Sequence, residues 1–134
     1  MVEKISHIGI AVESLEEQIP YYRDLLGLKF SGTEVVEDQR VKVAFFEVGD
    51  TRIELLEATD EESPIAKFIA KKGQGVHHMA YQVDDCQLAI NKMDGAGIRL
   101  IDTKPRVGAG GHKIAFLHPR STYGILTEMT EEHE

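Results

Sequence analysis

The chain has 134 residues, of which 42% are hydrophobic and 28% are charged, and its formal net charge is −8. This is a globular composition with an acidic balance and no basic stripe, so we expect one domain over 1–134 and no nucleic-acid partner. The single cysteine, Cys86, excludes an internal disulfide, and no run is apolar for long enough to span a bilayer or to act as a signal peptide. We therefore expect a cytoplasmic protein with no membrane partner.

The first half of the chain predicts a strand, a helix and a hairpin. Residues 4–12, "KISHIGIAV", are rich in β-branched side chains and predict the strand. Ser14 begins a capping box that predicts a helix start, while Pro20 inside that helix predicts a kink or a late start. The pair "GD" at 49–50 separates two strand-like runs and indicates a hairpin turn.

A short helix connects this half to a second half with the same order of elements. Ser63 suits the N-cap of the helix, Pro64 its first turn and Gly73 its end. We expect the last five residues of the chain to fray. The elements predicted for the second half are a strand at 77–83, a helix at 85–94, a strand at 98–102, and a pair of strands near 112–118 and 124–130.

The two halves also resemble each other residue by residue, at a period of about 71 residues. The alignment sets His7 opposite His78 and Glu54 opposite Glu128. Neighbouring side chains on a strand point to opposite faces, so only one of the adjacent histidines His77 and His78 faces inward. The repeat indicates that this residue is His78. The corresponding modules are 5–58 and 75–130, connected by 59–74.

The four repeated side chains are candidate metal ligands. Two imidazoles and two carboxylates suit a divalent metal of borderline softness, such as cobalt, nickel, zinc, manganese or iron. Taken singly, such residues are most often only solvated, but four of them at duplicated positions are hard to obtain by accident. Glu54 lies in the apolar run "IELLEA", where a buried unpaired carboxylate costs several kcal/mol, so we expect it to face solvent or to have a partner. The weaker candidates are His77, His112, His118 and His133.

Over about residues 5–130 the chain resembles the vicinal oxygen chelate superfamily, and within it the methylmalonyl-CoA epimerases. The stretches that carry the resemblance are "HIGIAVESLEE", "ESPIAKFIAKKGQGVHHMAYQVDD", "KPRVGAGGHKIAFLHPRS" and "GILTEM". The resemblance implies an α+β fold in which two βαβββ modules in tandem form a curved mixed sheet around a central metal site. It also implies a homodimer. The metal ligands that it implies are His7, Glu54, His78 and Glu128.

The resemblance further implies a reaction and a cofactor. The reaction interconverts (2R)- and (2S)-methylmalonyl-CoA by abstraction of the α-proton through a metal-stabilised enolate. The α-proton is far less acidic than a glutamic acid, so a carboxylate base needs that stabilisation. One divalent ion per chain is implied, with Co2+ expected first and Mn2+, Ni2+, Zn2+ or Mg2+ as alternatives.

Inversion of a carbon atom needs acid/base groups on both of its faces. Glu128 is the first candidate. In some relatives the second group is a glutamate at the position occupied here by Val43. Glu54 and Glu47 are the remaining carboxylate candidates, with Glu54 slightly favoured, and water or Lys113 stays open.

The glycine-rich segment 106–113 is a candidate cover or CoA-contact loop. Arg106, Lys104 and Lys113 are the cations that can meet carboxylate or phosphate charges there.

Three other readings compete with the epimerase. A glyoxalase I acting on a glutathione hemithioacetal can use the same four ligands, although the stretches "SPIAKF" and "VGAGG" favour the epimerase. An extradiol dioxygenase uses two histidines and one glutamate, which would leave Glu54 superfluous. A metal-free small-molecule binding module of the same fold commonly lacks the ligands, and this chain has all four.

Overall fold

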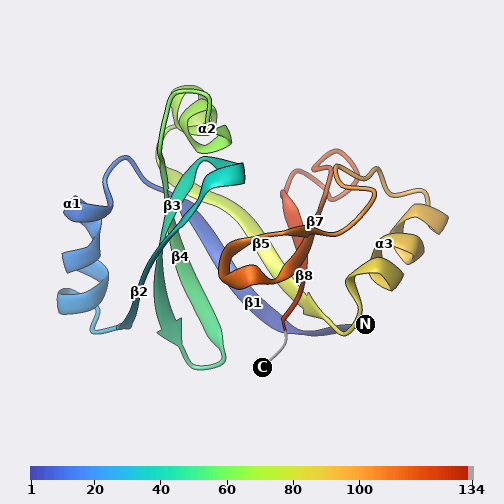
Figure 1. The fold of residues 1–134 in the computed structure, drawn as a ribbon, viewed down its shortest axis with the longest axis horizontal. Coiled ribbons are helices and arrows are strands. Elements are labelled where there is room, and N and C mark those ends of the chain that lie inside the picture. Colours follow the sequence, from blue (N-terminus) through green and yellow to red (C-terminus); the bar gives the residue numbers. More distant parts are fainter. Residues whose placement is uncertain (133–134) are drawn as a thin grey trace. The chain divides into compact units, whose positions relative to one another are not determined.

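A computed structural model describes residues 1–132 (Figure 1), so His133 lies outside the described residues. The chain divides into two compact units. The N-terminal unit is His7–His77, and the C-terminal unit combines Met1–Ser6 with the chain from His78 onward. The boundary therefore cuts strand β1 (Val2–Ala11) and strand β5 (Gly75–Val83), so that each unit holds part of both strands.

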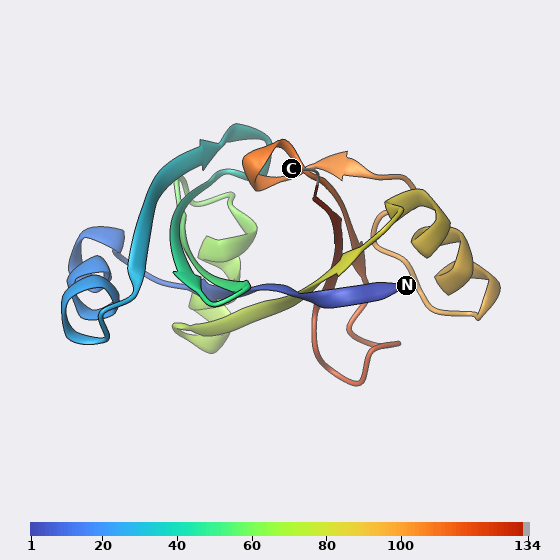
Figure 2. The same cartoon turned by 90° about the horizontal axis from the view of Figure 1, so that it is seen from below.

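The N-terminal unit has the order strand, helix, then three strands. After β1 come α1 (Leu15–Pro20), β2 (Lys29–Val36), β3 (Val41–Val48) and β4 (Thr51–Ala58). Strand β4 pairs in parallel with β1 and antiparallel with β3, which in turn pairs antiparallel with β2. Helix α1 lies on one side of these strands (Figure 2), where Leu15 packs with Phe46 and Leu55 in a buried apolar cluster.

The local signals in this unit act as predicted. The hydroxyl of Ser14 accepts the N–H of Glu17 at 3.1 Å and so caps α1. Pro20 has no N–H to donate, and α1 ends there and continues as a π-helical turn, η1 (Tyr21–Leu25). Gly49, at φ 58°, forms the turn of the β3–β4 hairpin. A short 3-10 turn, η2 (Glu37–Gln39), connects β2 and β3.

The connecting helix was also predicted correctly. It is α2 (Pro64–Lys72), and the hydroxyl of the fully buried Ser63 caps it by accepting the N–H of Ile65 at 3.1 Å. None of the helices in the described part of the chain is long and apolar enough to cross a membrane.

The C-terminal unit repeats this order in a shortened form. After β5 come α3 (Cys86–Gly95), β6 (Arg106–Val107), the 3-10 turn η3 (Ala109–Gly111), β7 (Lys113–Leu117) and β8 (Thr127–Glu131). Strand β8 pairs in parallel with β5 and antiparallel with β7. The hydrogen-bonded strand order is β2-β3-β4-β1-β5-β8-β7-β6. The expected α+β class and mixed sheet are therefore confirmed, while the single domain stays a prediction.

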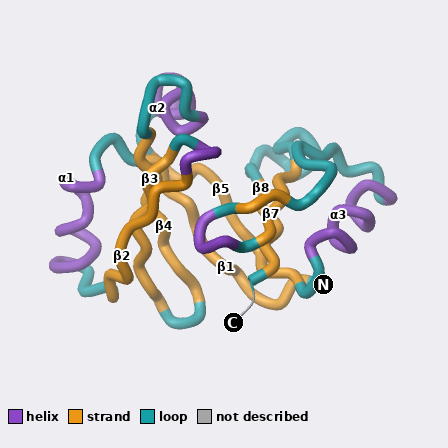
Figure 3. The backbone as a smooth tube through the Cα atoms, viewed as in Figure 1, coloured by secondary structure: helices purple, strands orange, loops and turns teal. Residues whose placement is uncertain are grey.

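Two predictions for this unit were wrong. The strand expected at 98–102 is only an isolated bridge between Leu100 and Leu117, in a segment drawn mostly as loop (Figure 3). The Asp102 carboxylate accepts the N–H of Phe116 at 2.8 Å. This N–H is then not available to pair with the backbone of a neighbouring strand. The fraying expected from residue 130 does not begin there, because β8 continues to Glu131 and both Thr130 and Glu131 are buried.

Candidate metal and acid/base site

In the N-terminal unit, a histidine and a glutamate meet on adjacent parallel strands. The register pairs Gly9 of β1 with Glu54 of β4, so His7, two residues before Gly9, presents its side chain to the same face as Glu54. The His7 Nδ1 atom lies 3.3 Å from Glu54 Oε2. Both residues are buried, at 5% and 3% exposure. The first of the two predicted His/Glu pairs is therefore present, and the carboxylate that needed a partner has one.

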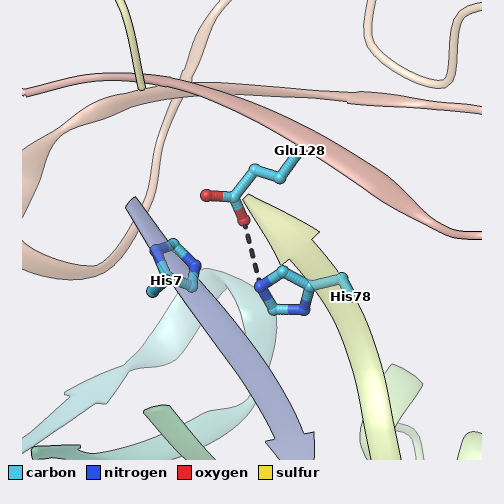
Figure 4. A group of neighbouring side chains, drawn as sticks. All are labelled: His7, His78 and Glu128. Carbon is cyan, nitrogen blue, oxygen red and sulfur yellow. Dashed lines mark ion pairs between the residues drawn. The ribbon is translucent and has the colours of Figure 1, made fainter. Parts of the chain in front are cut away.

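The C-terminal unit builds the second pair in the same way. The register pairs Ala80 of β5 with Glu128 of β8, again two residues beyond the histidine. The His78 Nε2 atom lies 3.4 Å from Glu128 Oε1 (Figure 4), and both residues are buried. The Phe116 ring meets His78 edge to face, with centroids 5.5 Å apart. The repeat in the sequence therefore corresponds to a repeat in strand register.

The adjacent His77 has a different environment. Its ring meets Phe68 of α2 edge to face at a centroid distance of 5.0 Å. Burial, and secondarily the positive charge of Lys72, lower the pKa of His77 to about 4. A histidine held neutral against an aromatic ring has a packing role, which is consistent with the choice of His78 over His77 from the repeat.

The chemistry of the donors fits a divalent metal. His7 in one unit, and His78 and Glu128 in the other, are buried imidazole and carboxylate donors of the kind that bind such an ion (Figure 4). A buried carboxylate is costly without a counter-charge, and a metal of borderline softness suits a mixture of imidazole and carboxylate donors. Glu54, the fourth predicted ligand, is in contact with His7 in its own unit.

Arg52 is a residue of this site that sequence reasoning missed. Its Nε and Nη2 atoms each donate to Glu54 Oε2 at 3.2 Å, and its side chain is 24% exposed. A signal was available in the sequence: Arg52 stands two residues before Glu54, so the two share one face of a strand.

The alternative acid/base candidate, Glu47, has its own partners. Its carboxylate accepts the Ser31 hydroxyl at 2.7 Å and pairs with Lys29 Nζ at 3.2 Å. These contacts lower the pKa of Glu47, the bond from Ser31 most strongly. Its side chain is 44% exposed. Val43 is buried and lies in register with Leu56.

The glycine-rich segment places one cation near the second pair. The Arg106 guanidinium lies over the Phe116 ring, 5.5 Å from its centroid, and its Nε lies 3.2 Å from Asp102 Oδ1. Arg106 and His78 therefore both contact the ring of Phe116. His118 lies in the turn after β7, where its Nδ1 accepts the N–H of Arg120 at 3.0 Å.

Comparison with known proteins places this geometry in a family. The family described as the glyoxalase/bleomycin resistance protein/dioxygenase superfamily matches residues 6–116. The ethylmalonyl-CoA/methylmalonyl-CoA epimerase of Cereibacter sphaeroides is 36% identical over 98% of this chain and 99% of its own length.

Two solved structures have the same fold over almost the whole chain. A hypothetical protein from Bacillus halodurans is 47% identical, with a TM-score of 0.96 over 98% of this chain and 95% of that one. A methylmalonyl-CoA epimerase in complex with methylmalonyl-CoA is 36% identical, with a TM-score of 0.93 over 98% of this chain and 96% of that one. The chain therefore belongs to the glyoxalase/bleomycin resistance protein/dioxygenase superfamily and, within it, to the family of enzymes that contains the methylmalonyl-CoA epimerases.

Proposed function

We propose that the protein is a metal-dependent epimerase that interconverts (2R)- and (2S)-methylmalonyl-CoA. The observation that carries the proposal is the duplicated His/Glu pair, built in the same strand register by His7 with Glu54 and by His78 with Glu128. Relatives of nearly the same length are named for this reaction, and one of them was solved with methylmalonyl-CoA.

The four paired residues are the proposed metal ligands. Two neutral imidazoles and two carboxylates would hold one divalent ion, with Co2+ as the first expectation. When bound, the ion supplies the positive charge that stabilises an enolate made from a thioester. The buried position of the ligands keeps water away from this charge and so strengthens its effect.

The chain's own carboxylates supply the proton transfers. We assign Glu128 to one face of the α-carbon, because it is buried and its carboxylate lies beside His78. Of the two carboxylates considered for the other face, Glu54 is favoured over Glu47. Glu54 is buried beside His7, whereas the side chain of Glu47 is 44% exposed.

Three further parts of the proposal concern partners and place. The candidate contacts for the carboxylate or phosphates of the acyl-CoA are Arg106, Lys104 and Lys113. The position of the Arg106 guanidinium over the Phe116 ring supports its inclusion. The homodimer and the cytoplasmic location stay predictions.

The decisive experiment is wash-in of deuterium at the α-carbon of methylmalonyl-CoA in D2O, followed by mass spectrometry. We expect metal-loaded protein to exchange this proton, and chelator to stop the exchange. Glu128→Gln should lower the exchange rate by at least about 10²-fold, because removal of a general base typically costs that much. Glu61→Gln, an exposed glutamate, is the matched control and should exchange normally.

Two outcomes would overturn the proposal. One is normal exchange by Glu128→Gln. The other is an absence of exchange by metal-loaded wild-type protein together with turnover of the hemithioacetal of methylglyoxal and glutathione, which would assign a glyoxalase I.

A further inference from the structure

Arg52 gives the first His/Glu pair a charge that the second pair does not receive from the same position. Its guanidinium donates two hydrogen bonds to a single oxygen, Glu54 Oε2. In the sequence repeat, the residue two before Glu128 is Leu126, which is uncharged. The two copies of the site therefore differ at this position, although their histidines and glutamates correspond.

Two carboxylates, those of Glu54 and Glu47, lie near Arg52, and Glu54 is the more deeply buried. The register pairs Arg52 with Glu47 across β3 and β4. Glu47, however, has Lys29 and Ser31 as its own partners, at 3.2 Å and 2.7 Å, and its side chain is 44% exposed. Glu54 is 4% exposed at the side chain, where solvent screens an ion pair far less.

We propose that Arg52 is a positioning residue that cancels the charge of Glu54, so that the two together act toward the metal as a neutral oxygen donor. This inference rests on the proposed metal site. It means that Glu54, with Arg52, adds no net negative charge to the set of ligands, although it is a carboxylate. A less negative ligand set leaves more of the metal's positive charge for the substrate.

The proposal makes a prediction whose sign is unusual. Removing a positive charge near a divalent cation strengthens its binding, so Arg52→Leu should bind Co2+ about tenfold more tightly. Glu54→Gln should bind it about tenfold more weakly, because it leaves Arg52 uncompensated. The double variant restores a neutral donor and should return to within about threefold of the wild-type affinity. If Arg52 only braced the strand, its loss would weaken binding.

The measurement is the Kd for Co2+ by isothermal titration calorimetry, with the visible absorption of bound Co2+ as a second readout. Arg52→Lys keeps the charge and should keep the wild-type Kd. Arg23→Leu is the matched control, since it removes an exposed arginine paired with Asp24 in the same unit and should leave the Kd unchanged. If Arg52→Leu does not fold, as judged by circular dichroism, Arg52→Gln takes its place.

The outcomes separate this inference from the function on which it rests. Unchanged or weaker Co2+ binding by the neutral Arg52 variant, with normal binding by wild type, overturns the role of Arg52 alone. If wild-type protein binds none of the divalent ions, the metal site itself is wrong and the proposed function falls with it.

Discussion

Two glutamates on neighbouring strands of the same unit differ in their burial and in their partners. Glu54 is buried between His7 and Arg52, and Glu47 is half exposed and tied to Lys29. The pKa of Glu47 is lowered, first by the hydrogen bond from Ser31 and then by Lys29, and its side chain is open to solvent. Burial next to a ligand, rather than strand phase alone, distinguishes the two candidates.

We therefore expect Glu47→Gln to keep the α-proton exchange rate within about twofold of wild type, and Glu54→Gln to lower it by about 10²-fold at saturating metal. The same deuterium assay, run with metal well above the Kd of each variant, measures both. A large loss in Glu47→Gln would identify that residue as the second acid/base, and full activity in both variants would eliminate both candidates.

The single thiol is also set by its surroundings. Cys86 is fully buried, and burial, followed by the negative charge of Glu131, raises its pKa to about 11. At pH 8 only about one thiol in a thousand is then the reactive thiolate. We expect iodoacetamide to leave the folded protein unlabelled over minutes and to label one site per chain in urea. Labelling of the folded protein at the rate of a free cysteine would contradict this burial.

At the scale of elements, each unit uses a glutamate on its last main strand to hold the start of its helix. The carboxylate of Glu57 accepts the N–H of Leu15 at 2.9 Å, and that of Glu131 accepts the N–H of Cys86 at 2.8 Å. These N–H groups belong to the first turn of a helix, where no carbonyl of the helix can accept them. The duplication thus preserves a structural contact as well as the candidate ligands.

Removing these contacts should destabilise the fold to different extents. We expect Glu131→Ala to lower the free energy of unfolding by about 2 kcal/mol and Glu57→Ala by about 1 kcal/mol, because Glu131 is buried and Glu57 is only partly so. Urea unfolding followed by circular dichroism measures both. The exposed Glu61→Ala serves as the control and should change stability by less than about 0.5 kcal/mol.

For the whole molecule, a bound metal should contribute to folding. A ligand that binds only the folded chain stabilises it by about 2.7 kcal/mol at one hundred times its Kd. For a chain of 134 residues we expect this to raise the Tm by roughly 10 °C. Differential scanning calorimetry with Co2+ and with chelator tests it. The shift should be much smaller in Glu128→Gln, and an equal shift in that variant would place the binding elsewhere.

Much of the fold was predictable because its signals are local. Alternation, the Ser14 and Ser63 caps and the turn at Gly49 act within a few residues, and the structure confirms them. The prediction of a strand at 98–102 was wrong for a non-local reason. The carboxylate of Asp102 accepts a hydrogen bond from the N–H of Phe116, fourteen positions away.

By itself the sequence determined the duplication and the four donor types, because two copies of one pattern place equivalent residues on equivalent strand faces. It also selected His78 over His77. Only the tertiary structure decided that Arg52 pairs with Glu54, that Lys29 and Ser31 occupy Glu47, and that β8 continues through Glu131. Those outcomes depend on which charged side chains pair across strands and on how deeply they are buried. The spacing of residues along the chain does not determine either of these.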